Sequence, residues 1–146
     1  MSTDTKDVPS LTVTTRIGLD RIGDLLCCAF EGGVGYWCTI VKKIPPAAPV
    51  EAWKVRAFAE DLGKPQGNGH TVYPHIEYPV NGGSLVLRAE DDPKRYTLDM
   101  AAIERGLAVM AEKYPKHFAD FVAENDDAET ADVFLQCCLF GEIVYG

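Results

Sequence analysis

Residues 84–115 read SLVLRAEDDPKRYTLDMAAIERGLAVMAEKYP, and their pattern changes from strand to helix part-way along. The first part predicts a strand over Ser84–Ala89, a turn at Asp91-Asp92-Pro93 and a short strand over Tyr96-Thr97-Leu98. Upstream, Asn81-Gly82-Gly83 predicts a hairpin turn that joins a strand over 71–80 to the first of these strands. The stretch therefore indicates a meander of antiparallel strands.

The second part of the same stretch is helical. Asp99 is a suitable N-cap for a helix that ends before Pro115. A short helix around Phe118 and Phe121 follows, and a last helix begins after Asp126 or Asp127. Glu129 lies three residues after Asp126, as in a capping box. The apolar residues that mark the inner faces of the first and last of these helices are Ile103, Leu107, Met110, Val133, Phe134, Cys137 and Cys138.

The N-terminal third adds a strand, a helix and another strand. β-Branched residues predict a strand over Leu11–Thr15, helical spacing predicts a helix over Leu19–Phe30, and Tyr36–Ile44 is typical of a strand. Residues 45–70 indicate a loop or helix insertion within a single domain of residues 1–146. The fold class expected is α+β: a mostly antiparallel sheet of about four to five strands packed against about three helices.

The composition is that of an acidic globular protein. The chain has 146 residues, and 14 Lys and Arg against 22 Asp and Glu give a net charge of −8. This charge argues against binding duplex nucleic acid or an anionic membrane, because phosphate contacts need clustered Lys and Arg. No apolar run approaches the roughly 20 residues of a membrane span, so we expect a cytoplasmic protein.

The five cysteines predict small buried side chains rather than disulfides or a metal site. Cys27-Cys28 and Cys137-Cys138 are adjacent pairs on helices, where neighbouring side chains point about 100° apart. Cys38 is the odd one, and no C-x-x-C motif is present. We therefore expect reduced thiols, no bound metal and no cofactor.

The sequence contains no recognisable catalytic motif. A nucleophile elbow, a P-loop, a dinucleotide-binding glycine motif and a zinc-protease helix are all absent. His70 and His75 are five residues apart, which places them on opposite faces of a strand, and we interpret them as surface residues. The acidic pairs at 91–92 and 126–127 suit turns and helix caps. We therefore expect a binding protein rather than an enzyme.

Arginines and aromatic residues are the candidates for ligand binding. In an acidic chain, an arginine turned into a groove makes a selective site for a phosphate group, although a surface ion pair is the other interpretation of each one. Tyr36, Trp37 and Tyr96 are candidates for stacking on a nucleobase. The arginines considered are Arg16, Arg21, Arg56, Arg88, Arg95 and Arg105.

A glycine-rich phrase occurs twice. In residues 25–37, LLCCAF runs into EGGVGYW, and in residues 135–146 LQCCLF runs into GEIVYG. In both, an apolar helix stops at glycine, as it does where the residue after the helix takes a positive φ. Gly32 and Gly33 also leave the backbone bare for close approach of a ligand or partner.

These two segments resemble a family of small bacteriophage proteins with E-G-G-x-x-Y-W and a closing L-F-G-E-x-x-Y-G, and the chain is similar to the first type of Thoeris anti-defence protein. The resemblance implies an oligomer, a dimer or trimer of dimers, in the host cytoplasm. It implies sequestration of a cyclic ADP-ribose isomer, and of cyclic oligonucleotides, without cleavage. The alternative is a protein-binding inhibitor such as an anti-CRISPR, with Asp91, Asp92, Asp126 and Asp127 exposed together on one face.

From these observations we expect an oligomer interface at the glycine-aromatic segment and the C-terminal tail. Arg16, Arg88 and Arg105 are expected to hold phosphates, and the aromatic residues to stack on the ligand or wall its pocket. The expected ligand-binding residues are Arg16, Gly32, Gly33, Tyr36, Trp37, Arg88, Tyr96 and Arg105.

Overall fold

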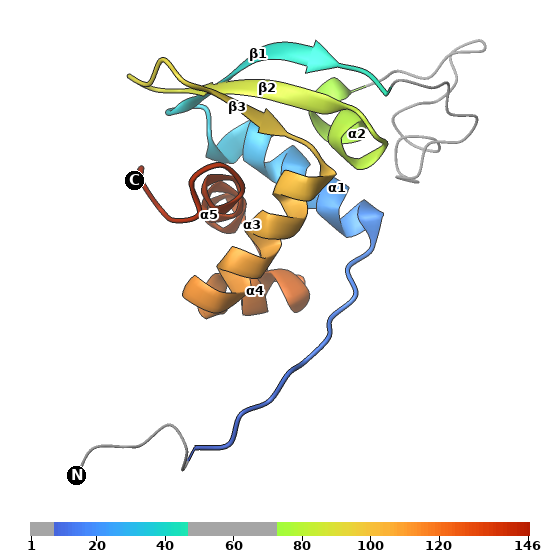
Figure 1. Cartoon of the computed structure of the whole chain (residues 1–146), viewed down its shortest axis with the longest axis vertical. Helices are drawn as coiled ribbons and strands as arrows, with labels where there is room; N and C mark the ends of the chain where they lie inside the picture. The colour runs from blue at the N-terminus through green and yellow to red at the C-terminus, as the bar shows by residue number, and fades with distance from the viewer. Residues whose placement is uncertain (1–7, 47–72) are drawn as a thin grey trace.

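The computed structural model describes residues 8–46 and 73–146 (Figure 1). The elements follow the order α1 (Leu19–Cys28), the π-helical turn η2 (Ala29–Gly33), β1 (Cys38–Ile44), α2 (Pro74–Val80), β2 (Ser84–Ala89), β3 (Arg95–Leu98), α3 (Met100–Lys113), α4 (Pro115–Val122) and α5 (Ala128–Phe140). Of the insertion expected at residues 45–70, all but residues 45 and 46 lies outside the described residues, and so does His70.

The described part of the chain is α+β, as predicted, with a smaller sheet and more helices than expected. The sheet has three antiparallel strands in the order β1-β2-β3, and five α-helices are present in the same described ranges. Leu87 of β2 pairs with Ile40 of β1 and Tyr96 of β3. The helices lie on one side of this sheet (Figure 1).

The predicted strand before Asn81-Gly82-Gly83 is wrong, because Pro74–Val80 forms α2. Pro74 occupies the first helical position, where its missing N–H costs nothing. Gly82 has φ of 101°, and the N–H of Gly83 donates to the carbonyl of Tyr78 at 2.7 Å. The glycines therefore end a helix instead of turning a hairpin. Both structures require a residue with positive φ, so the signal was ambiguous.

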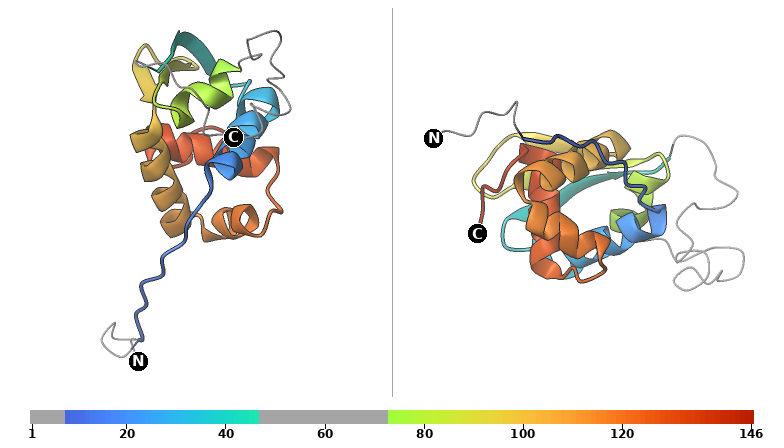
Figure 2. Two further views of the ribbon diagram at one scale, coloured as in Figure 1. Left: turned by 90° about the vertical axis from the view of Figure 1, so that its right-hand side faces the viewer. Right: turned by 90° about the horizontal axis from the view of Figure 1, so that it is seen from below.

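The predicted strand at Leu11–Thr15 is extended but unpaired. Residues 8–16 leave the body of the molecule as a single exposed segment in the described structure (Figures 1 and 2), and Ile17 is half-buried against the core. The other strand predictions hold, with β1 beginning at Cys38 rather than at Tyr36.

Helices α3 and α5 pack closely because Gly106 lies at their crossing. A Cβ at this position would lie 2.8 Å from the Cα of Cys138 on α5. The carboxylate of Asp99 caps α3 as predicted, accepting from the N–H of Ala102 at 2.9 Å, and Asp127 rather than Asp126 caps α5. The core beneath the sheet contains fully buried side chains from every layer, among them Leu25, Leu85, Leu98, Ile103 and Phe134.

Candidate functional site

The C-terminal tail is fastened to α5 by one buried glutamine. The Oε1 atom of Gln136 accepts from the N–H groups of Val144 at 2.6 Å and Tyr145 at 2.8 Å. Its amide nitrogen donates to Oδ1 of Asp132 at 2.9 Å and to the carbonyl of Tyr145 at 3.1 Å. The side-chain amide thus makes four hydrogen bonds, which is its usual capacity.

Trp37 and Tyr36 hold the same tail from the other side. The Trp37 ring stacks on Tyr145, with centroids 5.2 Å apart and planes 7° apart, and only 2% of Trp37 is exposed. Its indole N–H donates to Asp132 at 2.7 Å, and the Tyr36 hydroxyl donates to the other oxygen of Asp132 at 2.6 Å. The two segments therefore bind one another within a single chain, and the Trp37 ring has no open face for a ligand.

Tyr36 is the more exposed member of this cluster. Burial, the hydrogen bond to Asp132 and the charge of that carboxylate together raise the pKa of Tyr36 to about 12. Its hydroxyl therefore stays protonated and keeps donating to Asp132 throughout the neutral range.

The glycines of η2 serve the fold in different ways. A Cβ on Gly33 would lie 2.6 Å from the carbonyl oxygen of Ala128 at the start of α5, so Gly33 permits close approach of the chain to itself. No atom of the described structure lies within 4 Å of a Cβ built on Gly32. Neither residue has a positive φ, in contrast to Gly141, which ends α5 with φ of 76°. The positive-φ prediction is confirmed for the second phrase and wrong for the first.

Two predicted ligand residues, Tyr96 and Arg105, share a pocket of about 270 Å³ at the β3 edge of the sheet. Arg95 lines the same pocket. Its floor is formed by Cys138 and Leu139 of α5, which α3 approaches at its glycine. Arg95 belonged to the sequence candidates for phosphate binding but not to the expected site.

Arg88 lies next to this pocket, because it pairs with Arg95 across β2 and β3. Both are exposed, and neither they nor Arg105 have a carboxylate within ion-pair distance among the described residues. Arg95 donates to the carbonyl of Pro93 at 3.1 Å. We name Arg88, Arg95, Tyr96 and Arg105 the arginine edge.

Carboxylates near the arginine edge already have local partners. Asp92 accepts from the Tyr96 hydroxyl at 2.8 Å and from the backbone N–H of Lys94 at 2.9 Å. These bonds, the backbone one first, lower the pKa of Asp92. Asp99 lines the pocket but is committed to capping α3. Lys94 adds a cation 5.1 Å above the Tyr96 ring.

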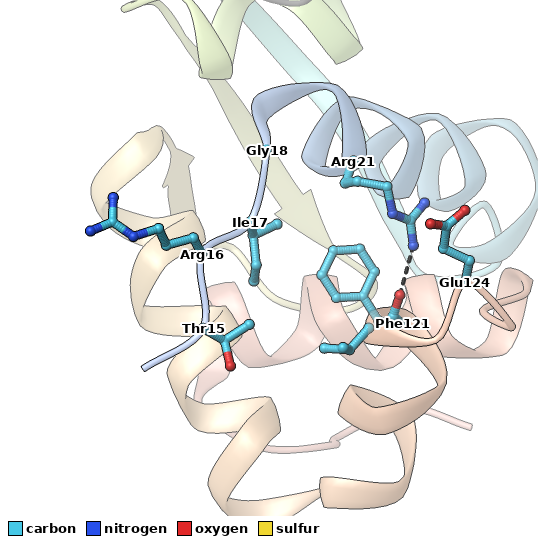
Figure 3. A pocket seen from close by; sticks show the side chains of 8 residues that line it. Thr15, Arg16, Ile17, Gly18, Arg21, Phe121 and Glu124 are labelled. Carbon is cyan, nitrogen blue, oxygen red and sulfur yellow. Dashed lines mark hydrogen bonds between the residues drawn. The ribbon is translucent and has the colours of Figure 1, made fainter. Parts of the chain in front are cut away.

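Arg16 lies elsewhere, at the rim of a second pocket of about 130 Å³ (Figure 3). Its guanidinium points away from Arg21 and Phe121. Arg21 lies over the Phe121 ring at 4.8 Å and donates to the Phe121 carbonyl at 2.7 Å and to Asp126 at 2.9 Å. Burial acts to lower the pKa of Arg21, but the hydrogen bond and the negative charge of Asp126 act in the opposite direction, and the pKa is raised overall. Arg21 therefore links α1 to the α4–α5 connection, and Arg16 is separate from the arginine edge.

The four aspartates named for the inhibitor alternative occupy two separate places. Asp91 and Asp92 lie in the turn beside β3, in the sheet layer. Asp126 pairs with Arg21, and Asp127 accepts from the backbone N–H of Thr130 at 3.0 Å as the α5 cap. Three of the four are thus used by the fold.

His75 is not the surface residue expected, because it lies half-buried in α2. Its Nε2 atom lies 2.7 Å from the carboxylate of Glu31, and both residues line a pocket of about 350 Å³ with Cys38. Burial lowers the pKa of His75 although Glu31 acts in the opposite direction. The contact with Glu31 is an ion pair only when the imidazole is protonated, which the burial of His75 disfavours.

The cysteines are free thiols with different degrees of burial. Cys137 and Cys138 are buried, Cys27 and Cys38 are half-buried and Cys28 is exposed. Burial raises the pKa of Cys38 to about 12 and that of Cys137 to about 11. In residues 8–46 and 73–146 no three His, Cys, Asp or Glu side chains are grouped as metal ligands would be.

The protein-family models, curated proteins and solved structures compared with this chain include no match to it. The resemblance to phage anti-defence proteins therefore stays a prediction. Among the described helices, none has the length and apolar character required to cross a membrane.

Proposed function

We propose that the chain binds a small phosphate-bearing ligand at the arginine edge and holds it without chemical change. The observation that carries this proposal is the shared pocket of Arg95 and Arg105, whose guanidinium groups have no carboxylate partner among the described residues. Arginine presents a planar fork of donors that matches a phosphate group. In a chain with a net charge of −8, such a local group of arginines is a selective place for an anion to bind.

The pocket is large enough to enclose only one portion of a nucleotide-sized ligand. Its volume of about 270 Å³ is just below the range of roughly 300–1,000 Å³ typical of small-molecule sites. We propose that a phosphate-bearing portion enters this pocket and accepts hydrogen bonds from Arg105 and Arg95, two of the residues that line it. A second phosphate would extend toward Arg88, the cross-strand neighbour of Arg95.

Tyr96 shapes this pocket rather than stacking on a base. Lys94 lies over its ring, Phe140 meets it edge-on with centroids 5.1 Å apart, and its hydroxyl is bound to Asp92. The ring is thus fixed as a wall, and we assign ligand affinity mainly to the arginines.

The phage resemblance narrows the ligand within this proposal. It favours a cyclic nucleotide-derived immune signal, a cyclic ADP-ribose isomer or a cyclic oligonucleotide, sequestered in the host cytoplasm by a homo-oligomer. Sequestration requires affinity without turnover. Released ligand should therefore be recovered intact.

Isothermal titration calorimetry with cyclic ADP-ribose isomers and with cyclic di- and trinucleotides tests the proposal. Arg95→Ala and Arg105→Ala should each lose about 1.5–3 kcal/mol of binding free energy, roughly ten- to a hundredfold in affinity. Arg16→Ala is the matched control, because it removes an exposed arginine that lies away from the pocket. Its affinity should equal that of the wild type.

The outcomes separate the parts of the proposal. Absence of binding to every ligand rejects the function. Unchanged affinity in both Arg95→Ala and Arg105→Ala rejects the site. The ligand is then released by heat and identified by mass spectrometry. Detection of a cleaved nucleotide would show that the protein is an enzyme rather than a binding protein.

A further inference from the structure

The segment before α1 is an exposed apolar arm. Leu11 is 85% exposed and Val13 is 77% exposed. The backbone groups of residues 10–15 have no hydrogen-bond partner among the described residues. We name residues 8–16 the arm. An extended segment with bare apolar side chains and unpaired backbone groups is the kind of chain that pairs with another strand.

An apolar groove of about 720 Å³ opens where the arm joins the body. One wall is formed by the chain from Val13 into α1, where Leu19 and Ile22 contribute, and the other by α3 and α4. Leu107, Ala108 and Phe118 line that second wall, and Glu104 is the charged residue at the rim. The groove is therefore large, open and mostly apolar, and it lies beside a segment of matching character.

The arm and the groove agree in length and in side-chain pattern. Residues 8–15 span roughly 26 Å when extended, and α3 with its 14 residues is roughly 21 Å long. Side chains alternate along an extended chain, so Leu11 shares a face with Val13, Thr15 and Ile17, three of the four residues of this segment that line the groove; Thr14 is the fourth. Arg16 is the single charged residue from Val8 to Leu19, and it complements Glu104 at the rim.

The arm is poorly suited to fold back into its own groove. Its base already forms one wall, so filling the groove with Leu11 would require a reversal near Val13. Residues 12–15 are Thr-Val-Thr-Thr, a β-branched run without glycine that favours extended backbone over a tight turn. A second copy meets no such restriction, because a two-fold axis places two arms side by side and antiparallel.

We propose that two copies of the chain exchange arms, each arm lying in the groove of the other copy. Leu11 and Val13 then pack against α3 and α4 of the partner subunit, and the two arms pair as antiparallel strands. The interface is isologous, the same surface being used on both subunits. It also differs from the glycine-aromatic and C-terminal interface expected from sequence, whose segments are occupied within the chain.

Sedimentation velocity over concentrations of about 1–100 µM tests the exchange. The wild type should form a dimer, and Val13→Asp should weaken it about tenfold or more, because a carboxylate would enter an apolar groove. Thr12→Asp is the matched control: it adds the same charge to the opposite face of the arm and should leave the dimer unchanged.

A second pair of variants tests the groove. Ala108→Glu places a charged side chain in it from an exposed helical position and should also give monomers. Ala119→Glu adds the same side chain at an exposed position of α4 outside the groove and should remain dimeric. A monomeric wild type overturns the proposal. So does a dimer that Val13→Asp and Ala108→Glu leave intact, or one that Thr12→Asp disrupts equally.

Discussion

Replacing Gln136 by Leu should release the C-terminal tail without disturbing the rest of α5. Leucine has a similar size but removes four hydrogen bonds, three of them to the backbone of Val144 and Tyr145. At about 0.5–1.5 kcal/mol for each bond, the sum would be roughly 2–6 kcal/mol. The tail is terminal and can detach, so its backbone groups recover hydrogen bonds with water. We therefore expect a loss of about 2–4 kcal/mol.

Urea unfolding followed by fluorescence measures this loss and locates it. In a Trp53→Phe background, emission reports on Trp37 alone, since the chain has two tryptophans. Gln136→Leu should lower the unfolding free energy and also shift native-state emission, because Trp37 loses its stack on Tyr145.

Gln136→Glu is a control that keeps both the size and the Oε1 acceptor. Its second oxygen would face Asp132 and the carbonyl of Tyr145, both of which are acceptors. The pKa of the new carboxyl should be raised in the folded state. Its destabilisation should therefore be present at pH 7 and diminish as the pH falls toward about 4. If Gln136→Leu costs less than about 0.5 kcal/mol and leaves Trp37 emission unchanged, the tail is not held by this amide.

Three further changes test other parts of the structure. Gly106→Ala should cost about 1–3 kcal/mol in urea unfolding, because the added methyl group meets α5 where the helices cross. At pH 8, an alkylating reagent followed by peptide mass mapping should modify exposed Cys28 before Cys38, whose pKa burial raises to about 12. The backbone N–H groups of α5 lower the pKa of Asp127, so its stabilisation is present above the ordinary pKa and is lost as the pH falls through the lower folded value. Melting temperature should therefore fall less steeply below about pH 4 in Asp127→Ala than in the wild type.

Elements set by local chemistry could be predicted from the sequence. The cap at Asp99, the apolar spacing of α3 and the prolines that bound α4 all act within a few residues. The failure at α2 is also local in origin. Asn81-Gly82-Gly83 supplies the positive φ that both a hairpin and a helix end require, and only the tertiary structure distinguishes the two.

The site could be predicted less well, because its residues meet through long-range contacts. Tyr96 and Arg105 were identified, but Arg95 was only among the six arginines considered and was not chosen for the site; the structure of β3 places it in the lining of their pocket. Asp132 and Gln136 were missed. A signal for them existed: both are polar, four residues apart on one face of a helix whose inner positions after Thr130 are otherwise apolar.

The tail explains why the aromatic residues misled the sequence interpretation. From the sequence, Trp37 is expected to stack on a ligand and the C-terminal tail to form an oligomer interface, yet Trp37, Phe140 and Tyr145 contact one another and form a cluster beside the core. Because these rings pack against one another within the chain, they do not indicate a bound ligand or a partner protein. In the described structure, the groups without a partner lie elsewhere. The arginines of the arginine edge have no carboxylate within ion-pair distance among the described residues, and the apolar side chains of the arm are exposed to solvent. Ligand binding and self-association can therefore be altered separately, by Arg105→Ala and Val13→Asp.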